Sequence, residues 1–117
     1  MTTPNRPINR HNAYHAHVYF DADTLDFATQ LCKEAGQKFS LEIGRIHQKP
    51  VGPHTQWSCQ IKFNKNDFEH FIPWLEKNRE GLNVLVHAVT GDDYTDHSQY
   101  AYWLGNEEKL NLNIFKR

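Results

Sequence analysis

Regular alternation of apolar and polar residues is the feature that most constrains the fold of this chain. In residues 13–20 the apolar members of the alternation are Tyr14, Ala16, Val18 and Phe20. Residues 55–63 alternate in the same way. Because successive side chains of a strand point to opposite faces, each segment is predicted to be a strand with one apolar face. Residues 39–47 and 83–89 are predicted to form two further strands.

Two segments with helical spacing separate these strands. The first carries apolar residues from position 25 to 35, with Asp21 or Asp23 as its predicted cap and Gly36 as its predicted end. The second follows Asn64 or Asn66, either of which can cap a helix. A proline-containing loop at residues 49–53 lies between the second and third strands, because proline lacks the donor that a strand ladder needs.

The order of these elements predicts an α+β fold. A βαββαβ chain is expected to form a ferredoxin-like antiparallel sheet with two helices on one face. After it, Asp92 or Asp93 is expected to open an extra helix that runs through Trp103, and residues 110–114 are expected to form an extra strand. We predict a polar lead-in at residues 1–12 and a single domain at residues 13–117.

Length and charge exclude several classes of protein. With 117 residues the chain has room for one ordinary domain. Its formal net charge is −1, with acidic and basic residues mixed, so nucleic acid and anionic membranes are not expected partners. No stretch approaches the roughly 20 apolar residues that cross a bilayer. The N-terminus does not resemble a signal peptide, which predicts a cytoplasmic protein with Cys32 and Cys59 as buried thiols.

The chain contains eight histidines, and four of them can share one face of the predicted sheet. His15 and His17 lie on the polar side of the first strand, His54 has the parity of the polar side of the third, and His87 falls on that side of the fourth if its branched neighbours pack on the helices. Neighbouring strands lie about 4.8 Å apart. Imidazoles on them can therefore converge on one ion, with metal–nitrogen bonds of about 2.1 Å. A single strand histidine is more often a hydrogen-bonded core or surface residue, so the hypothesis depends on the shared face.

The other four histidines have less defined places. His47 precedes the proline loop and is either a ligand at the edge of the sheet or an acid–base group. His97 lies in the predicted late helix, where a solvated or capping role is the default. His11 and His70 are expected at the surface.

Several motifs resemble those of the DOPA 4,5-dioxygenase family. They lie at 14–20 (YHAHVYF), 45–54 (RIHQKPVGPH), 84–87 (VLVH), 90–92 (TGD), 96–97 (DH) and 103–105 (WLG). The resemblance extends over nearly all of residues 13–115, and its most specific part is PVGPH. Ala88 stands where many relatives have proline.

The resemblance implies a ferredoxin-like dimer that cleaves the ring of a catechol, such as L-DOPA, with nonhaem Fe(II) and dioxygen. Such a centre needs facial ligands with open positions, commonly two histidines and a carboxylate. The predicted metal ligands are His17, His54 and His87. The predicted acid–base groups are His15, His47 and His97. Arg45 and Tyr19 are the predicted substrate-binding residues, while a carboxylate ligand from Glu42 and a site of three histidines alone both stay open.

Two other classes of function fit the same residues. One is a cofactor-independent monooxygenase or isomerase on the same fold, in which the histidines bind an organic substrate. The other is a non-enzymatic dimer that binds a metal or a small ligand. Zinc or nickel would also suit a histidine cluster, and either can be acquired during purification.

Overall fold

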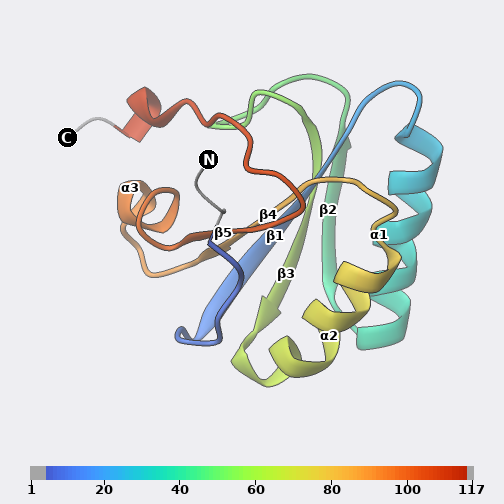
Figure 1. Ribbon diagram of the computed structural model, residues 1–117, viewed down its shortest axis with the longest axis horizontal. Helices are drawn as coiled ribbons and strands as arrows, with labels where there is room; N and C mark the ends of the chain where they lie inside the picture. The colour runs from blue at the N-terminus through green and yellow to red at the C-terminus, as the bar shows by residue number, and fades with distance from the viewer. Residues whose placement is uncertain (1–4, 116–117) are drawn as a thin grey trace.

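Five antiparallel strands form one sheet in the order β2-β3-β1-β4-β5. They are β1 (Ala13–Phe20), β2 (Glu42–His47), β3 (Trp57–Asn64), β4 (Val84–Ala88) and β5 (Ala101–Leu104). The computed structural model describes residues 5–115, so the predicted lead-in at residues 1–12 and domain at residues 13–117 both extend beyond the described part. β1 is the central strand of the sheet (Figure 1), so its side chains reach the core on one face and the opposite side of the sheet on the other.

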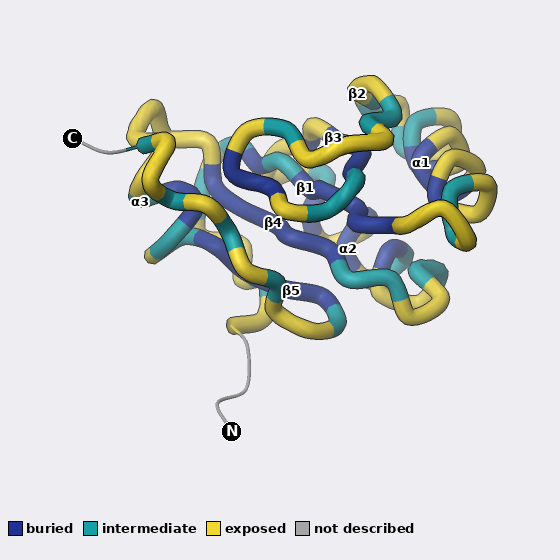
Figure 2. The backbone as a smooth tube through the Cα atoms, turned by 90° about the horizontal axis from the view of Figure 1, so that it is seen from above, coloured by how far each residue is buried: buried dark blue, intermediate teal, exposed yellow. Residues whose placement is uncertain are grey.

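Two helices, α1 (Leu25–Phe39) and α2 (Lys65–Asn78), cover one face of the sheet (Figure 1). The apolar set of β1 packs toward them, as its alternation predicts, together with the buried faces of β3 and β4. The buried segments of the strands lie in the centre of the molecule (dark blue in Figure 2). Its fully buried side chains include Tyr14, Val18, Ile61, Phe71, Leu75, Val84 and Val86. An α+β architecture is therefore confirmed.

Both ends of α1 differ from the sequence prediction. The N-cap residue is Thr24, and Asp21 instead accepts backbone hydrogen bonds in the turn before the helix. The helix also continues through Gly36 to Phe39, and its C-cap residue, Ser40, adopts a left-handed conformation with φ 55°. Gly36 has a packing role, because a Cβ there would lie 2.8 Å from Cγ1 of Ile43 on β2. A close approach between helix and strand therefore explains a glycine that the sequence suggested as a stop signal.

Asn64 caps α2, as one of the two predicted alternatives. Its side chain accepts hydrogen bonds from the backbone N–H groups of Asn66 and Asp67. In return the Asp67 carboxylate accepts from the Asn64 N–H at 3.0 Å, which completes a capping box.

The predicted late helix is wrong beyond its first turn. Asp92 caps it as expected, but α3 covers only Asp93–Asp96. Residues 97–100 instead form a turn, and Ala101–Leu104 form β5, which pairs with β4. Tyr102 and Leu104 pack into the core, while Ala101 and Trp103 face the other side of the sheet. The side chains of this segment therefore alternate with the period of two that is typical of a strand, not with the helical period.

The predicted last strand at residues 110–114 is also wrong. Leu110 makes one isolated bridge with His54, and Leu112–Phe115 is a 3₁₀ helix. This segment crosses the face of the sheet opposite α1 and α2 (Figure 1).

The N-terminal segment lies along the outer edge of β5. The Trp103 N–H donates to the carbonyl of Asn5 at 2.7 Å, and the Arg6 guanidinium donates to the carbonyls of Trp103 and Gly105. At the opposite edge of the sheet, β2 pairs only with β3 among the described strands.

Cys32 and Cys59 are buried and unbridged, as predicted. Within residues 5–115, no helix combines the length and the apolar character that crossing a membrane would require.

Candidate metal centre

Three histidines meet on the face of the sheet that α1 and α2 leave free. His15 and His17 alternate with the core residues of β1, and His87 does the same on β4. His15 and His87 are register partners across the β1–β4 ladder. The side-chain parity of the two strands therefore places all three imidazoles on one face, as the sequence predicts.

The nitrogens of these rings are close enough to serve as a ligand group. One nitrogen from each of His15, His17 and His87 lies within 4.8 Å of the other two. The Nε2 atoms of His17 and His87 are 3.0 Å apart. Two nitrogens bound at right angles to one ion, each at about 2.1 Å, would be separated by about 3.0 Å. The donor set therefore fits a metal ion, with open positions left for other ligands.

Hydrogen bonds to the backbone fix the orientation of two rings. His87 Nδ1 lies 2.8 Å from the Ala88 carbonyl, and His97 Nδ1 lies 2.8 Å from the Asp93 carbonyl. A carbonyl only accepts, so in both rings Nδ1 carries the proton. In its neutral form each ring then has its lone pair on Nε2, which is how histidine ligands are commonly oriented, and at His87 this lone pair faces His17 Nε2 at 3.0 Å.

Two more histidines surround the group. The His54 ring lies 4.1 Å from the His17 ring, and the His97 ring lies 4.0 Å from the His87 ring, measured between centroids. His54 Nδ1 is 2.7 Å from the hydroxyl of Tyr19. Five of the predicted site residues thus cluster with Tyr19, although the part that each plays stays a prediction.

This face of the sheet is covered, which the sequence did not predict. The turn that carries His54 is closed by a bond from its N–H to the Val51 carbonyl. Asn111 N–H then donates to the Pro53 carbonyl at 2.7 Å, which ties the C-terminal segment over the turn. As a result His17 and His54 are each only 6% exposed, and His87 is 3% exposed.

Burial keeps these imidazoles neutral near pH 7. Burial first, and then the neighbouring His97, lower the pKa of His54 to about 4 and that of His87 to about 3. The pKa of His17 lies well below its ordinary value, mainly through burial and then through His54 and His87. Burial and then Lys62 lower the pKa of His15. Neutral imidazoles can bind a metal without first losing a proton.

Tyr19 is hydrogen-bonded to His54. Burial, followed by the charge of Glu108, raises the Tyr19 pKa, so its hydroxyl keeps its proton. Among the described residues the only hydrogen-bond partner of this hydroxyl is His54 Nδ1. The hydroxyl can donate to Nδ1 or accept from an Nδ1–H, so the direction of this bond goes with the tautomer of His54.

His47 and Arg45 lie farther out on β2. His47 pairs with Ser58, which pairs with Tyr19 across the next ladder, and it is close enough to lower the pKa of His54. Arg45 is exposed in the irregular stretch of β2, and no described contact links it to the histidine cluster. The functional predictions for both residues remain predictions.

Asp96 is a site residue that the sequence did not single out by itself. It is 2% exposed, and its carboxylate accepts from the backbone N–H of Thr90 at 2.8 Å and from the Thr90 hydroxyl at 2.7 Å. These bonds hold α3 against the loop that follows β4. Asp96 directly precedes His97 in the chain, so they also hold the segment that carries His97. Thr90 belongs to the TGD motif and Asp96 to the DH motif. The reason for both motifs becomes clear only in the structure, where hydrogen bonds join the two residues.

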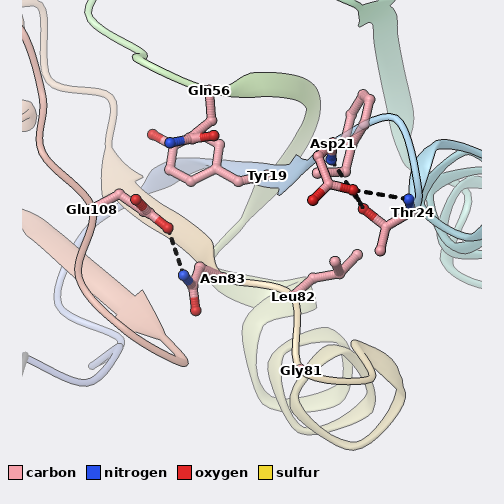
Figure 3. A pocket seen from close by; sticks show the side chains of 9 residues that line it. Tyr19, Asp21, Thr24, Gln56, Gly81, Leu82, Asn83 and Glu108 are labelled. Carbon is pink, nitrogen blue, oxygen red and sulfur yellow. Dashed lines mark hydrogen bonds between the residues drawn. The ribbon is translucent and has the colours of Figure 1, made fainter.

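Two cavities adjoin the cluster. The larger, of about 370 Å³, includes His97 in its wall. Its other lining residues are polar or charged (Asn5, Ser98, Glu107, Glu108 and Lys109) and apolar (Ala101, Trp103, Leu110 and Leu112). The smaller, of about 170 Å³, lies at the end of β1 and is walled on one side by Tyr19 (Figure 3). Its polar wall includes Glu108, which accepts a hydrogen bond from Asn83 at 2.6 Å.

Comparison with known proteins gives consistent matches. The model of the Dopa 4,5-dioxygenase family matches residues 14–114. An uncharacterized 21.2 kDa protein from Botryotinia fuckeliana is 33% identical over 90% of this chain, and a DOPA 4,5-dioxygenase from Amanita muscaria is 28% identical over 85% of it. The matches span 64% and 47% of those two relatives, which is less than two thirds of either. The crystal structure of a candidate dioxygenase from Nostoc punctiforme is 43% identical, covers 90% of this chain and 91% of its own, and superposes with a TM-score of 0.86.

Proposed function

The chain belongs to the Dopa 4,5-dioxygenase family, and from this premise we propose that it cleaves the aromatic ring of a catechol, such as L-DOPA, with Fe(II) and dioxygen in an extradiol reaction. The observation that carries the proposal is the convergence of neutral, buried imidazoles within 4.8 Å on one face of the sheet. Such a group has little use in packing, because apolar side chains would fill the same space without unpaired nitrogens.

His15, His17 and His87 are the ligands in this proposal. His17 and His87 are also the ligands predicted from sequence, whereas His15 takes the place predicted for His54. The reason is distance, because the group whose nitrogens all lie within 4.8 Å of one another consists of His15, His17 and His87 and does not include His54. His54, next to this group and bonded to Tyr19, is placed to form a hydrogen bond with a substrate oxygen.

His97 is the proposed proton acceptor. Its Nδ1–H is bound by the Asp93 carbonyl, so its Nε2 is free to take a proton from a catechol hydroxyl in the adjoining cavity. Fe(II) in such centres supplies electron transfer between a catecholate and dioxygen, a reaction that is slow without a reduced metal. The cavity of about 370 Å³ offers Trp103 and Leu110 as apolar contacts for an aromatic ring.

We extend the proposal to the assembly and its location. The strand order β2-β3-β1-β4 with two helices on one face supports a ferredoxin-like assignment, and the family resemblance supports a homodimer. The edge of β2 has no described partner and is a candidate for contact between subunits. The two free, buried thiols are compatible with the reducing cytoplasm. Light scattering with size-exclusion chromatography tests the dimer.

The activity is tested by oxygen uptake. The chain is reconstituted with Fe(II) under anaerobic conditions and mixed with air-saturated buffer and a panel of catechols that includes L-DOPA. We expect uptake of one O₂ per catechol and a yellow ring-opened product that carries both atoms of labelled dioxygen. Uptake that yields only a quinone, or no uptake with any catechol, would contradict ring cleavage.

A pair of variants tests the choice of ligand. His15→Gln is expected to lose tightly bound Fe(II), whereas His54→Gln is expected to retain it and to turn over more slowly. His70→Gln, on the exposed surface of α2, is the matched control. The reverse outcome, with iron lost from the His54 variant alone, would restore the ligand set predicted from sequence.

A metal-binding protein without oxygenase activity is the second candidate. Within the described residues the ligand group consists of imidazoles without a carboxylate, and such a set also suits zinc or nickel. Tight binding of zinc together with the absence of oxygen uptake in the iron form would favour this function.

A further inference from the structure

A third cavity, of about 250 Å³, lies between the N-terminal segment and β5. Seven of the residues that line it carry polar or aromatic groups, namely Asn5, Arg6, Arg10, His11, Gln99, Tyr100 and Tyr102. None of them belongs to the proposed metal centre. His11 is expected from sequence to lie at the surface, but its ring lies 4.6 Å from the Tyr100 ring at an interplanar angle of 51°, and its Nε2 lies 3.0 Å from the Tyr102 hydroxyl.

The alternation of β5 separates this cavity from the metal centre. Ala101 and Trp103 line the cavity that includes His97, whereas Tyr102 packs with the core on the opposite face of the sheet. The third cavity therefore opens on the other side of the strand, and a ligand in it would not touch the histidine cluster.

The charges around this cavity favour an anion. Two guanidinium groups and an imidazole line it, and the described residues of its wall include no carboxylate, in a chain whose net charge is −1. Arg6 is already held in place by two backbone carbonyls through Nη1, at 3.0 and 2.9 Å, which leaves its other N–H groups available. Guanidinium groups bind carboxylates and phosphates in a bidentate manner.

The aromatic walls favour a flat organic group beside that charge. The rings of His11 and Tyr100 are 4.6 Å apart, and the ring of Tyr102 lies 6.1 Å from that of His11. Ile8, which is 45% exposed, adds an apolar contact in the same wall. A volume of about 250 Å³ is more than an inorganic phosphate alone would fill.

We propose that this cavity binds a small aromatic acid, whose carboxylate or phosphate pairs with Arg10 and Arg6 while its ring lies against His11 and Tyr100. The proposal is independent of the ring-cleavage activity, because it uses the other face of β5.

The test is a titration of the full chain followed by NMR. Phenyl phosphate and benzoate are the anionic probes, inorganic phosphate tests the need for the ring, and benzamide is the neutral probe of matching shape. We expect both aromatic anions to shift the resonances of His11, Tyr100 and Tyr102, while the indole signal of Trp103 stays unchanged. Benzamide and inorganic phosphate should each bind at least about tenfold more weakly.

Arg10→Gln is expected to weaken phenyl phosphate binding at least about tenfold, the loss expected from one charge-assisted hydrogen bond. Arg10 is exposed, so this variant should fold normally. Lys33→Gln removes the same charge from the exposed surface of α1 and should leave the affinity unchanged. Equal losses in the two variants, equal binding of benzamide, or shifts confined to Trp103 and His97 would overturn the proposal. Equal binding of inorganic and phenyl phosphate would overturn its aromatic part.

Discussion

Acid should unfold the metal-free chain through the histidine cluster. The pKa values of His17, His54 and His87 are lowered in the folded chain, to about 4 for His54 and about 3 for His87, whereas each ring titrates near 6.5 when unfolded. Unfolding therefore takes up protons below pH 6.5. The stability that these neutral rings provide is fully present above that pH and is lost progressively as the pH falls toward 4.

The expected size of the effect follows from linkage. Each ring that is neutral when folded and protonated when unfolded removes about 1.4 kcal/mol of stability per pH unit. Between pH 7.5 and pH 5 this amounts to about 2 kcal/mol for one histidine, and to about 6 kcal/mol for three that act independently. A total of that size is comparable with the whole stability of a small domain, typically about 5–15 kcal/mol.

Urea unfolding at a series of pH values measures this dependence. A chelator is present throughout, because protons and metal ions compete for the same nitrogens. We expect His54→Gln to reduce the slope of unfolding free energy against pH by about 1.4 kcal/mol per pH unit below pH 6. His70→Gln, on the exposed face of α2, should leave the slope as it is. An unchanged slope in the His54 variant would refute the inference that this ring is neutral and buried in the folded chain.

Three further outcomes are expected. Gly36→Ala should lower the free energy of unfolding by about 1 kcal/mol in urea, because the added Cβ would lie 2.8 Å from Ile43; a gain in stability would instead show that helix propensity dominates. Asn64→Ala should lower it by about 1 kcal/mol through loss of the capping box, and an unchanged urea midpoint would count against the cap. His97→Gln should reduce kcat about 100-fold or more with catechol while the chain keeps its iron, and unimpaired turnover would remove His97 as the proton acceptor.

Parity along single strands was enough to predict much of the site. Alternation in β1 and β4 placed His15, His17 and His87 on the face opposite the helices, because the direction of a strand side chain depends only on its position. The same local reasoning found the cap of α2 at Asn64. These features required no knowledge of distant parts of the chain.

The errors arose where distant segments decide the structure. Gly36 suggested a helix end, but its role depends on a neighbour in β2 that sequence order alone does not identify. The residues before Trp103 follow a capped turn and suggested a continuing helix, yet pairing with β4 makes them a strand. The cover over the histidines comes from contacts between the turn at Pro53 and the C-terminal segment near Asn111. Long-range pairing of this kind leaves no periodic signal in the sequence.

The central claim is that His17 and His87 hold a metal ion together with a third imidazole. Anaerobic dialysis with Fe(II), followed by elemental analysis, measures it directly on the parent chain, on the double variant His17→Gln/His87→Gln, and on the surface variant His70→Gln. We predict about one iron per chain in the parent and the surface variant, and less than about a tenth of that in the double variant. Full iron content in a folded double variant would contradict the claim.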